Sequence, residues 1–233
     1  MMNAAAGIFL AARRKGWTNP YVTDGLVAMW DGEWNSVGGQ HDANGKYLYD
    51  IINDEYADLM TSQFRAGTNY WEVTRASATG KTSSLSTAFL SAIVGGYARI
   101  ETVLYPNVVA TQIYGNNCFS ISGGYFGYNE HSGNGGCSIF SSGWVSAKDT
   151  ALVGVPVGNV ALDLDAANNT IKYTVGKVDS AIGSITIPDT IKNGCCMNNV
   201  GTRFYSLRIY SRALTAAEIA ANYAVDKARF NLP

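Results

Sequence analysis

The sequence is short of charge, and this shortage excludes several classes of protein. Only 15% of its 233 residues are charged, the net charge is −1, and the one basic run is Arg13-Arg14-Lys15. Nucleic-acid-binding proteins usually present a basic face, so we expect no nucleic-acid partner. Apolar residues make up 47% of the chain, which is enough for a sizeable core and too many for a disordered protein.

Cysteine is scarce, with four residues and no Cys-x-x-Cys pair. A structural zinc site is therefore not expected. Cys195 and Cys196 are adjacent, and adjacent cysteines seldom bridge each other because the geometry is strained. We expect four free, mostly buried thiols in a protein made in the reducing cytoplasm. A Cys118–Cys137 bridge across a hairpin is the alternative.

The N-terminus lacks the features of a cleavable signal peptide. The apolar run Ala4–Ala12 precedes the basic cluster, whereas a signal peptide has its positive residues first, and the run is too short to span a membrane. We expect residues 1–20 to be an uncleaved arm and linker, with a short helix closed by Gly16. This arm would dock on a partner chain, support self-assembly or anchor the protein; the alternative is a frayed leader. Residues 21–233 would form one domain.

Paired carboxylates at strand spacing are also missing. Glycoside hydrolases use two carboxyl groups that flank the scissile bond, but Glu101 and Glu130 each stand alone in this sequence. The two histidines, His41 and His131, lie in Gly-rich stretches without a nucleophile elbow or metal-ligand spacing. We therefore expect that the protein is not an enzyme.

Tyr, Gly, Ser, Asn and Thr carry the polar character instead, a mixture typical of β-sheets with many turns. Alternating patterns predict strands at 26–30, 97–105, 160–165, 170–175 and 204–210. Many short strands between turn signals predict an all-β, two-sheet antiparallel jelly-roll sandwich, with a barrel as the alternative.

The predicted strands assign side chains to faces. In 97–105 the odd-numbered residues, from Tyr97 to Tyr105, share one face of the strand. Strands 160–165 and 170–175 form a predicted hairpin, and Val160, Leu162 and Leu164 share one face of its first strand. In the last strand we expect Tyr205, Leu207 and Ile209 on one face, with Phe204, Ser206, Arg208 and Tyr210 on the other.

A short C-terminal helix follows the last strand. Thr215 and Glu218 have the spacing of a capping box, and Leu214 and Ile219 occupy the positions of a hydrophobic staple. We expect the helix to end near Lys227, with Ile219 and Tyr223 one turn apart on its buried face.

The stretch Phe204–Tyr223, "FYSLRIYSRALTAAEIAANY", resembles the closing strand and helix of laminin-G-like jelly rolls in the concanavalin A-like lectin and glucanase superfamily. "GLVAMWDGEWN" resembles the first strand of that family, "YARIETVLY" an early sheet strand and "NNTIKYTVGKV" a later hairpin. The resemblance covers roughly residues 21–230 and matches 107–158 poorly. It implies a lectin-like fold of the kind found in gut bacterial and phage surface proteins.

The resemblance leaves a calcium site doubtful. Many family members carry an acidic residue just before the Arg-Ile-Tyr motif, where this chain has Tyr205 and Ser206. Asp163, Asp165 and Asn168 offer other oxygen ligands, with exposed turn acids as the simpler interpretation. No other cofactor is expected.

The most promising binding segment runs from Ser122 to Trp144, where aromatic residues lie among glycines. Sugar sites use flat aromatic faces together with amide, hydroxyl and carboxylate groups, although the same aromatics could instead fill the core. The candidate ligand-binding residues are Trp34, Tyr125, Tyr128, Asn129, Glu130, His131 and Trp144.

Together these features predict a non-catalytic glycan-binding or adhesive module, displayed in multiple copies on a virion or cell surface. The main alternative is a purely structural or decoration subunit of a phage particle, and a glycoside hydrolase is a third. Fold alone does not decide between these classes.

Overall fold

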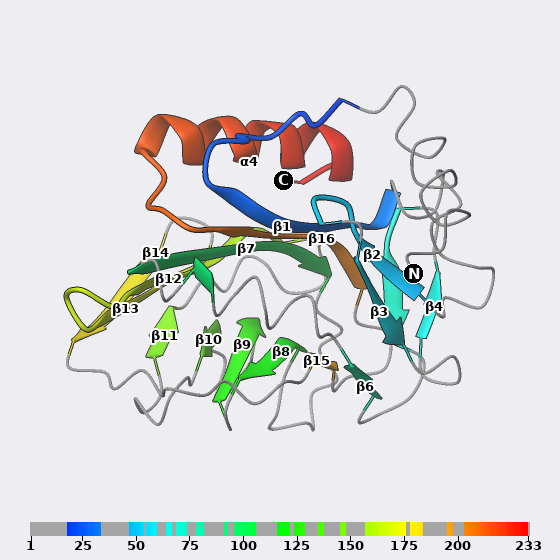
Figure 1. Cartoon of the computed structure of the whole chain (residues 1–233), viewed down its shortest axis with the longest axis horizontal. Coiled ribbons are helices and arrows are strands. Elements are labelled where there is room, and N and C mark those ends of the chain that lie inside the picture. The colour runs from blue at the N-terminus through cyan, green and yellow to red at the C-terminus, as the bar shows by residue number, and fades with distance from the viewer. Residues whose placement is uncertain are drawn as a thin grey trace, which may run out of the picture.

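The computed structural model describes sixteen strands and one helix, and its parts are shown in Figure 1. The described residues are 18–33, 47–53, 55–59, 64–66, 69–73, 78–81, 91–92, 96–105, 116–121, 124–128, 135–137, 145–147, 157–175, 178–183, 195–197 and 203–232. The predicted N-terminal helical arm, residues 1–16, lies outside them. No helix among these segments is long and apolar enough to cross a membrane.

The largest sheet has the strand order β14-β13-β12-β7-β16-β5-β4, and β1 also pairs with β16. All of its strand pairs are antiparallel. Its strands are β1 (Leu26–Asp31), β4 (Phe64–Ala66), β5 (Trp71–Val73), β7 (Tyr97–Tyr105), β12 (Val157–Asp165), β13 (Thr170–Val175), β14 (Val178–Gly183) and β16 (Arg203–Tyr210).

The first and last strands of the large sheet, β1 and β16, pair with each other. Trp30 lies opposite Leu207 and Leu26 opposite Tyr210, so two segments about 180 residues apart are neighbours. The predicted hairpin is confirmed: β12 pairs with β13 around the turn Ala166–Asn169, and Asn169 adopts the left-handed conformation that such a turn needs.

One side of this sheet is an apolar core layer. The register places Ile100 beside Leu162 and Ile209, and all three are fully buried. The layer is extended by alternate residues of β7, β12 and β13, which are Ala98, Leu104, Val160, Leu164, Ile171 and Tyr173. The period-2 patterns of the sequence therefore find the core-facing side of these strands correctly.

A bulge in β16 changes the predicted faces. Phe204 lies opposite Leu104, but Ser206 lies opposite Val103, so Tyr205 is the extra residue. Phe204 therefore shares the core side with Leu207, whereas Tyr205 packs with Val103 and Phe230 on the helix side. The prediction that Tyr205 shares a face with Leu207 and Ile209 was wrong, because strict alternation cannot register an inserted residue.

Helix α4 (Ala216–Phe230) lies across the other side of the large sheet (Figure 1). The predicted capping box is present: Thr215 Oγ1 accepts the N–H of Glu218, and the Glu218 carboxylate accepts the N–H of Thr215. The helix runs to Phe230, three residues beyond the predicted end, and Asn231 caps it in the left-handed conformation.

The buried face of α4 differs from the expected one. Its buried residues are Asn222, Asp226 and Phe230, whereas Ile219 and Tyr223 are only partly buried. Two of these three side chains are polar, so a hydropathy pattern assigns them to solvent. The partners that make their burial possible lie on strands distant in the sequence.

The remaining described strands form two smaller sheets, ordered β11-β10-β9-β8 and β15-β6-β3-β2. In Figure 1, β8–β11, β15 and β6 lie on the opposite side of the large sheet from α4. Their bounds are β2 (Tyr47–Asp50), β3 (Glu55–Leu59), β6 (Ala78–Lys81), β8 (Asn116–Ile121), β9 (Gly124–Tyr128), β10 (Gly135–Cys137), β11 (Val145–Ala147) and β15 (Cys195–Met197).

The all-β class with a C-terminal helix is thus confirmed. The described pairs group into three sheets, and β10 joins β9 in parallel through Gly136 and Tyr128. The detailed two-sheet jelly-roll topology stays a prediction.

Candidate functional site

The segment predicted to bind ligand contributes two neighbouring strands, β9 and β10, to one sheet. Tyr125 and Tyr128 both lie in β9, where Tyr125 pairs with Ser120 and Tyr128 with Asn116. On the other edge of β9, Tyr128 is opposite Gly136 of β10, and β10 pairs with β11. The other candidates, Trp34, Asn129, Glu130, His131 and Trp144, lie outside the described residues, so their gathering into one site stays a prediction.

The same sheet argues against the Cys118–Cys137 bridge. Cys118 is in β8 and Cys137 in β10, and β9 lies between these two strands. Neighbouring strands are about 4.8 Å apart, so strands on either side of a third are roughly 9–10 Å apart. A disulfide needs Cα atoms within about 7 Å. The alternative of a Cys118–Cys137 bridge across a hairpin is therefore wrong, because these cysteines do not lie on paired strands.

The most highly organised polar region among the described residues is a buried charge layer between the large sheet and α4. Arg208 is its centre, with only 2% of its side chain exposed. Its guanidinium donates two hydrogen bonds to Asp226, at 2.8 and 2.7 Å, and contacts Glu101 at 3.3 Å. The ring of Tyr21 covers it at 4.0 Å from the centroid. Arg208 thus joins strand β16 to helix α4.

Asn222 and Tyr21 complete this centre. Asn222 Nδ2 donates to Glu101 and to the hydroxyl of Tyr210, and its Oδ1 accepts the backbone N–H of Val22. The hydroxyl of Tyr21 donates to Asp226 at 2.7 Å. The segment preceding β1 is therefore fastened to α4 by hydrogen bonds that span some 200 residues of sequence.

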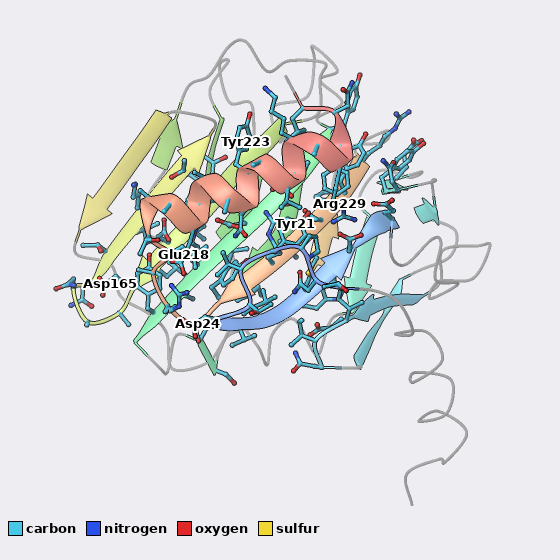
Figure 2. All side chains as sticks on the ribbon, turned by 90° about the horizontal axis from the view of Figure 1, so that it is seen from above. Tyr21, Asp24, Asp165, Glu218, Tyr223 and Arg229 are labelled. Carbon is cyan, nitrogen blue, oxygen red and sulfur yellow. The ribbon has the colours of Figure 1, made fainter. Side chains whose placement is uncertain are left out.

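Two flanking ion clusters extend the layer along the sheet. Toward the start of β7, Arg99 bridges Glu101 and Asp163, and the hydroxyl of Tyr97 donates to Asp163. Toward the end of α4, Arg229 donates to both oxygens of Asp31 at 2.7 and 2.8 Å. Figure 2 shows Tyr21 beside α4, Arg229 near the end of that helix, Glu218 near its start and Asp165 next to the hairpin turn.

The electrostatics of this layer suit a fixed structure better than acid–base chemistry. Burial opposes the charge on Glu101, but Arg208 and Arg99 outweigh it, so the pKa of Glu101 is lowered. A general acid near neutral pH needs a raised pKa instead. Burial likewise works against the charge of Arg208, but Asp226 more than offsets it and the pKa is raised well above its usual value.

The carboxylates considered as calcium ligands already accept hydrogen bonds from other residues of the chain. Asp163 accepts from Arg99 and from Tyr97, and Asp165 accepts the backbone and side-chain N–H groups of Asn168. The structure describes no group of three or more His, Cys, Asp or Glu side chains arranged to hold a metal within the segments it covers.

A second polar region on the helix side was missed by sequence reasoning. Tyr70, Tyr105 and Tyr205 surround Arg203 at the start of β16, and we name these four residues the tyrosine–arginine cluster. The Arg203 guanidinium carbon lies 4.7 Å from the ring centroid of Tyr70 and 5.4 Å from that of Tyr105. The alternation in 97–105 placed Tyr105 correctly on the face of Arg99 and Glu101, but no sequence signal indicated its partners.

No protein-family model matches this chain, and no curated protein matches it. Several solved structures match this chain. A Trypanosoma rangeli sialidase in complex with 2,3-difluoro-KDN is 11% identical, with a TM-score of 0.56 over 97% of this chain and 39% of that one. The same enzyme with sialic acid gives a TM-score of 0.54. The binding domain of botulinum neurotoxin serotype C1 is 11% identical, with a TM-score of 0.50 over 88% of this chain and 52% of that one.

At these identities the likeness concerns the fold alone. The chain spans less than two-fifths of the sialidase and about half of the neurotoxin domain. It therefore shares a β fold with part of an enzyme crystallised with sugar acids and with part of a toxin's binding domain.

Proposed function

We propose that the chain is a non-catalytic glycan-binding or adhesive module with a laminin-G-like jelly roll of the concanavalin A-like superfamily. The observation that carries the proposal is the fold: 97% of the chain superposes on part of a sialidase structure that contains sialic acid. The resemblance of Phe204–Tyr223 to the closing strand and helix of laminin-G-like domains supports the same family, since that strand and capped helix occur here as expected.

The acids of the charge layer are poor candidates for glycoside hydrolysis. Glu101 is the only glutamate of β7, and two arginines and an asparagine hold its buried carboxylate in the ionised form, which does not suit the general acid of a glycosidase. Asp163 on the adjacent strand is likewise paired with Arg99. Glu101 accepts a hydrogen bond from Asn222 of α4, and both acids are buried.

The proposed ligand site is the Tyr125–Trp144 segment, together with Trp34. Aromatic rings offer a flat face to sugar C–H groups at a small entropy cost, and Asn129 and Glu130 supply hydrogen-bonding groups. A shallow site of this kind binds weakly, with a Kd of about 0.1–1 mM. Useful adhesion then needs several copies, which favours display on a virion or cell surface.

The N-terminal arm has a place in this proposal. Residues 1–16 would contact a partner protein or a second copy and so generate the multivalency. Deletion of residues 1–16 should then leave the domain folded and impair assembly, as measured by analytical ultracentrifugation. A truncated protein that assembles like the full chain would contradict this part of the proposal.

The test of the proposed function is a glycan array probed with the purified full chain, with and without calcium. Binding should be detected, and it should weaken in Tyr128→Ala and Trp144→Ala, with near-UV circular dichroism as the check on folding. Failure of the wild-type chain to bind any glycan would overturn the proposal and favour a structural subunit of a phage particle. Turnover of β-glucans that Glu130→Gln abolishes would favour a hydrolase.

A further inference from the structure

The tyrosine–arginine cluster is arranged across three adjacent strands of the large sheet. Arg203 of β16 lies opposite Tyr105 of β7 on one side and opposite Glu72 of β5 on the other. Its Nε donates to Glu72 at 2.9 Å. Tyr70, which directly precedes β5, contacts Tyr205 with 5.7 Å between ring centroids, and Tyr205 packs in turn on Phe230. The cluster therefore rests on regular strands and on the end of α4, not on a loose loop.

The cluster remains open to solvent, unlike the charge layer beside it. The side chain of Arg203 is 38% exposed, against 2% for Arg208. Tyr70 and Tyr105 are partly buried, whereas Tyr205 is 6% exposed. The rigid part of the cluster is thus enclosed, and a guanidinium with two flanking phenol rings is presented at the surface.

The chemistry of this surface is that of a saccharide subsite. A guanidinium held in plane by aromatic rings offers N–H donors at a fixed spacing, which suits adjacent hydroxyl groups. Phenol rings beside it offer apolar area for the C–H groups of a pyranose and hydroxyls for further hydrogen bonds. Because Glu72 and the two tyrosine rings already restrict the motion of Arg203, ligand binding costs less side-chain entropy.

The charge of the cluster selects between sugar classes. Arg203 is paired with Glu72, whose side chain is 9% exposed, so the pair presents a directional donor without a net charge. A carboxylated or sulfated ligand would have to compete with Glu72 for the cation. A neutral sugar uses the same donors without that cost.

We propose that Tyr70, Tyr105 and Arg203 form a binding subsite for a neutral saccharide on the helix side of the sheet. This inference rests on the proposed glycan-binding function but places a site where the sequence indicates none. In Figure 1, β9 and α4 lie on opposite sides of the large sheet, so the two locations can be separated by mutation.

The experiment titrates the full chain with lactose and cellobiose, with 3′-sialyllactose as the anionic comparator, and follows backbone amide signals by NMR. We expect shifts at the end of β7 and the start of β16. Tyr105→Leu should weaken binding about tenfold, because aromatic anchors dominate such contacts. Arg203→Lys, which keeps the charge opposite Glu72 and loses the planar donors, should also weaken it.

Tyr97→Leu is the matched control. Tyr97 is the same residue type on the same strand and the same face as Tyr105, but it lies at the opposite end of β7 and donates to Asp163. Its replacement should leave the affinity within about twofold of wild type, since it lies outside the subsite. Thermal unfolding of each variant checks that the fold is intact, and the wild-type shift map needs no variant.

Four results decide the matter. Localised shifts at β7 and β16, with loss of affinity only in Tyr105→Leu and Arg203→Lys, support the subsite. Binding that maps to β9 and persists in both variants overturns the subsite and leaves the proposed function standing. Binding of 3′-sialyllactose alone, weakened steeply by salt, overturns the neutral-sugar assignment. A wild-type chain that binds none of these three sugars overturns the neutral-saccharide subsite, and the glycan array decides the proposed function separately.

Discussion

At the centre of the large sheet both sides are buried, but they are built from different side chains. On the side away from α4, the layer around Ile100 and Leu162 is mainly apolar, and its buried Thr102 donates to the backbone carbonyl of Ser206. On the side that faces α4, Arg208, Glu101 and Asp226 are buried just as completely. Apolar contact is non-directional, whereas each buried charge requires a particular partner at a particular position.

The difference suggests what each side specifies. Burial on the apolar side stabilises any well-packed arrangement of these side chains. It therefore favours formation of the sheet without fixing which element covers the opposite side. The charged side accepts α4 only in the position that brings Asp226 to Arg208 and Asn222 to Glu101. We infer that the charge layer fixes the position of the helix along the sheet, as buried polar groups fix register in coiled coils.

The largest expected effect comes from breaking the charged side. Arg208→Met should lower the free energy of unfolding by about 3–5 kcal/mol, because Asp226 and Glu101 would be left buried without their shared cation. Chemical denaturation followed by circular dichroism measures this loss. Adding Asp226→Leu to Arg208→Met should restore part of the stability, since it removes one uncompensated charge. A single variant as stable as wild type would show that water already reaches the layer.

Leu162→Ala is the corresponding change on the apolar side. It should cost about 2–5 kcal/mol through lost burial and the cavity left behind. No second-site change of charge should rescue it, which separates the two sides even where the losses are similar. Recovery of Leu162→Ala by Asp226→Leu would contradict the distinction.

The sequence predicts the apolar side far better than the charged one, for a physical reason. Alternation along one strand identifies Val160, Leu162 and Leu164, and the three-residue spacing of Thr215 and Glu218 identifies the cap, because both signals are local. Asn222 and Glu101 are 121 residues apart, and nothing in either local pattern marks them as partners.

The candidate sites show the same division. The glycine–aromatic segment Tyr125–Trp144 is contiguous and could be found by composition, whereas the tyrosine–arginine cluster draws on three segments that only the sheet register brings together. Tyr205 was assigned to the wrong face because its bulge depends on the pairing with β7. Long-range partners, bulges and buried polar stripes are the features that a single sequence leaves undetermined.

Acidification should sharpen the comparison, with a smaller effect than Arg208→Met. The pKa of Glu101 is lowered in the folded protein, with Arg208 and Arg99 overcoming the effect of burial. Its charge therefore stabilises the fold above the ordinary carboxyl pKa of about 4.3, and that contribution is lost as the pH falls through the folded value. Glu101→Gln should reduce the loss of stability between about pH 7 and about pH 3.

Denaturant titrations at the two pH values measure this difference. Leu162→Ala is the control, since it lowers stability at both values without removing a titrating group from the charge layer. An unchanged acid response in Glu101→Gln would show that other carboxyl groups carry the pH dependence.

The smallest expected effect tests whether the start of α4 is held independently of the charge layer. Thr215→Ala should cost about 1 kcal/mol, because the N–H of Glu218 loses its acceptor at the first turn of the helix. The cap is exposed and lies near the end of α4 that is remote from the tyrosine–arginine cluster, so glycan binding should not change. In the double variant with Arg208→Met the two losses should add within about 0.5 kcal/mol. A smaller combined loss would mean that α4 has already detached once Arg208 is gone, so that the charge layer, and not the cap, holds the whole helix on the sheet.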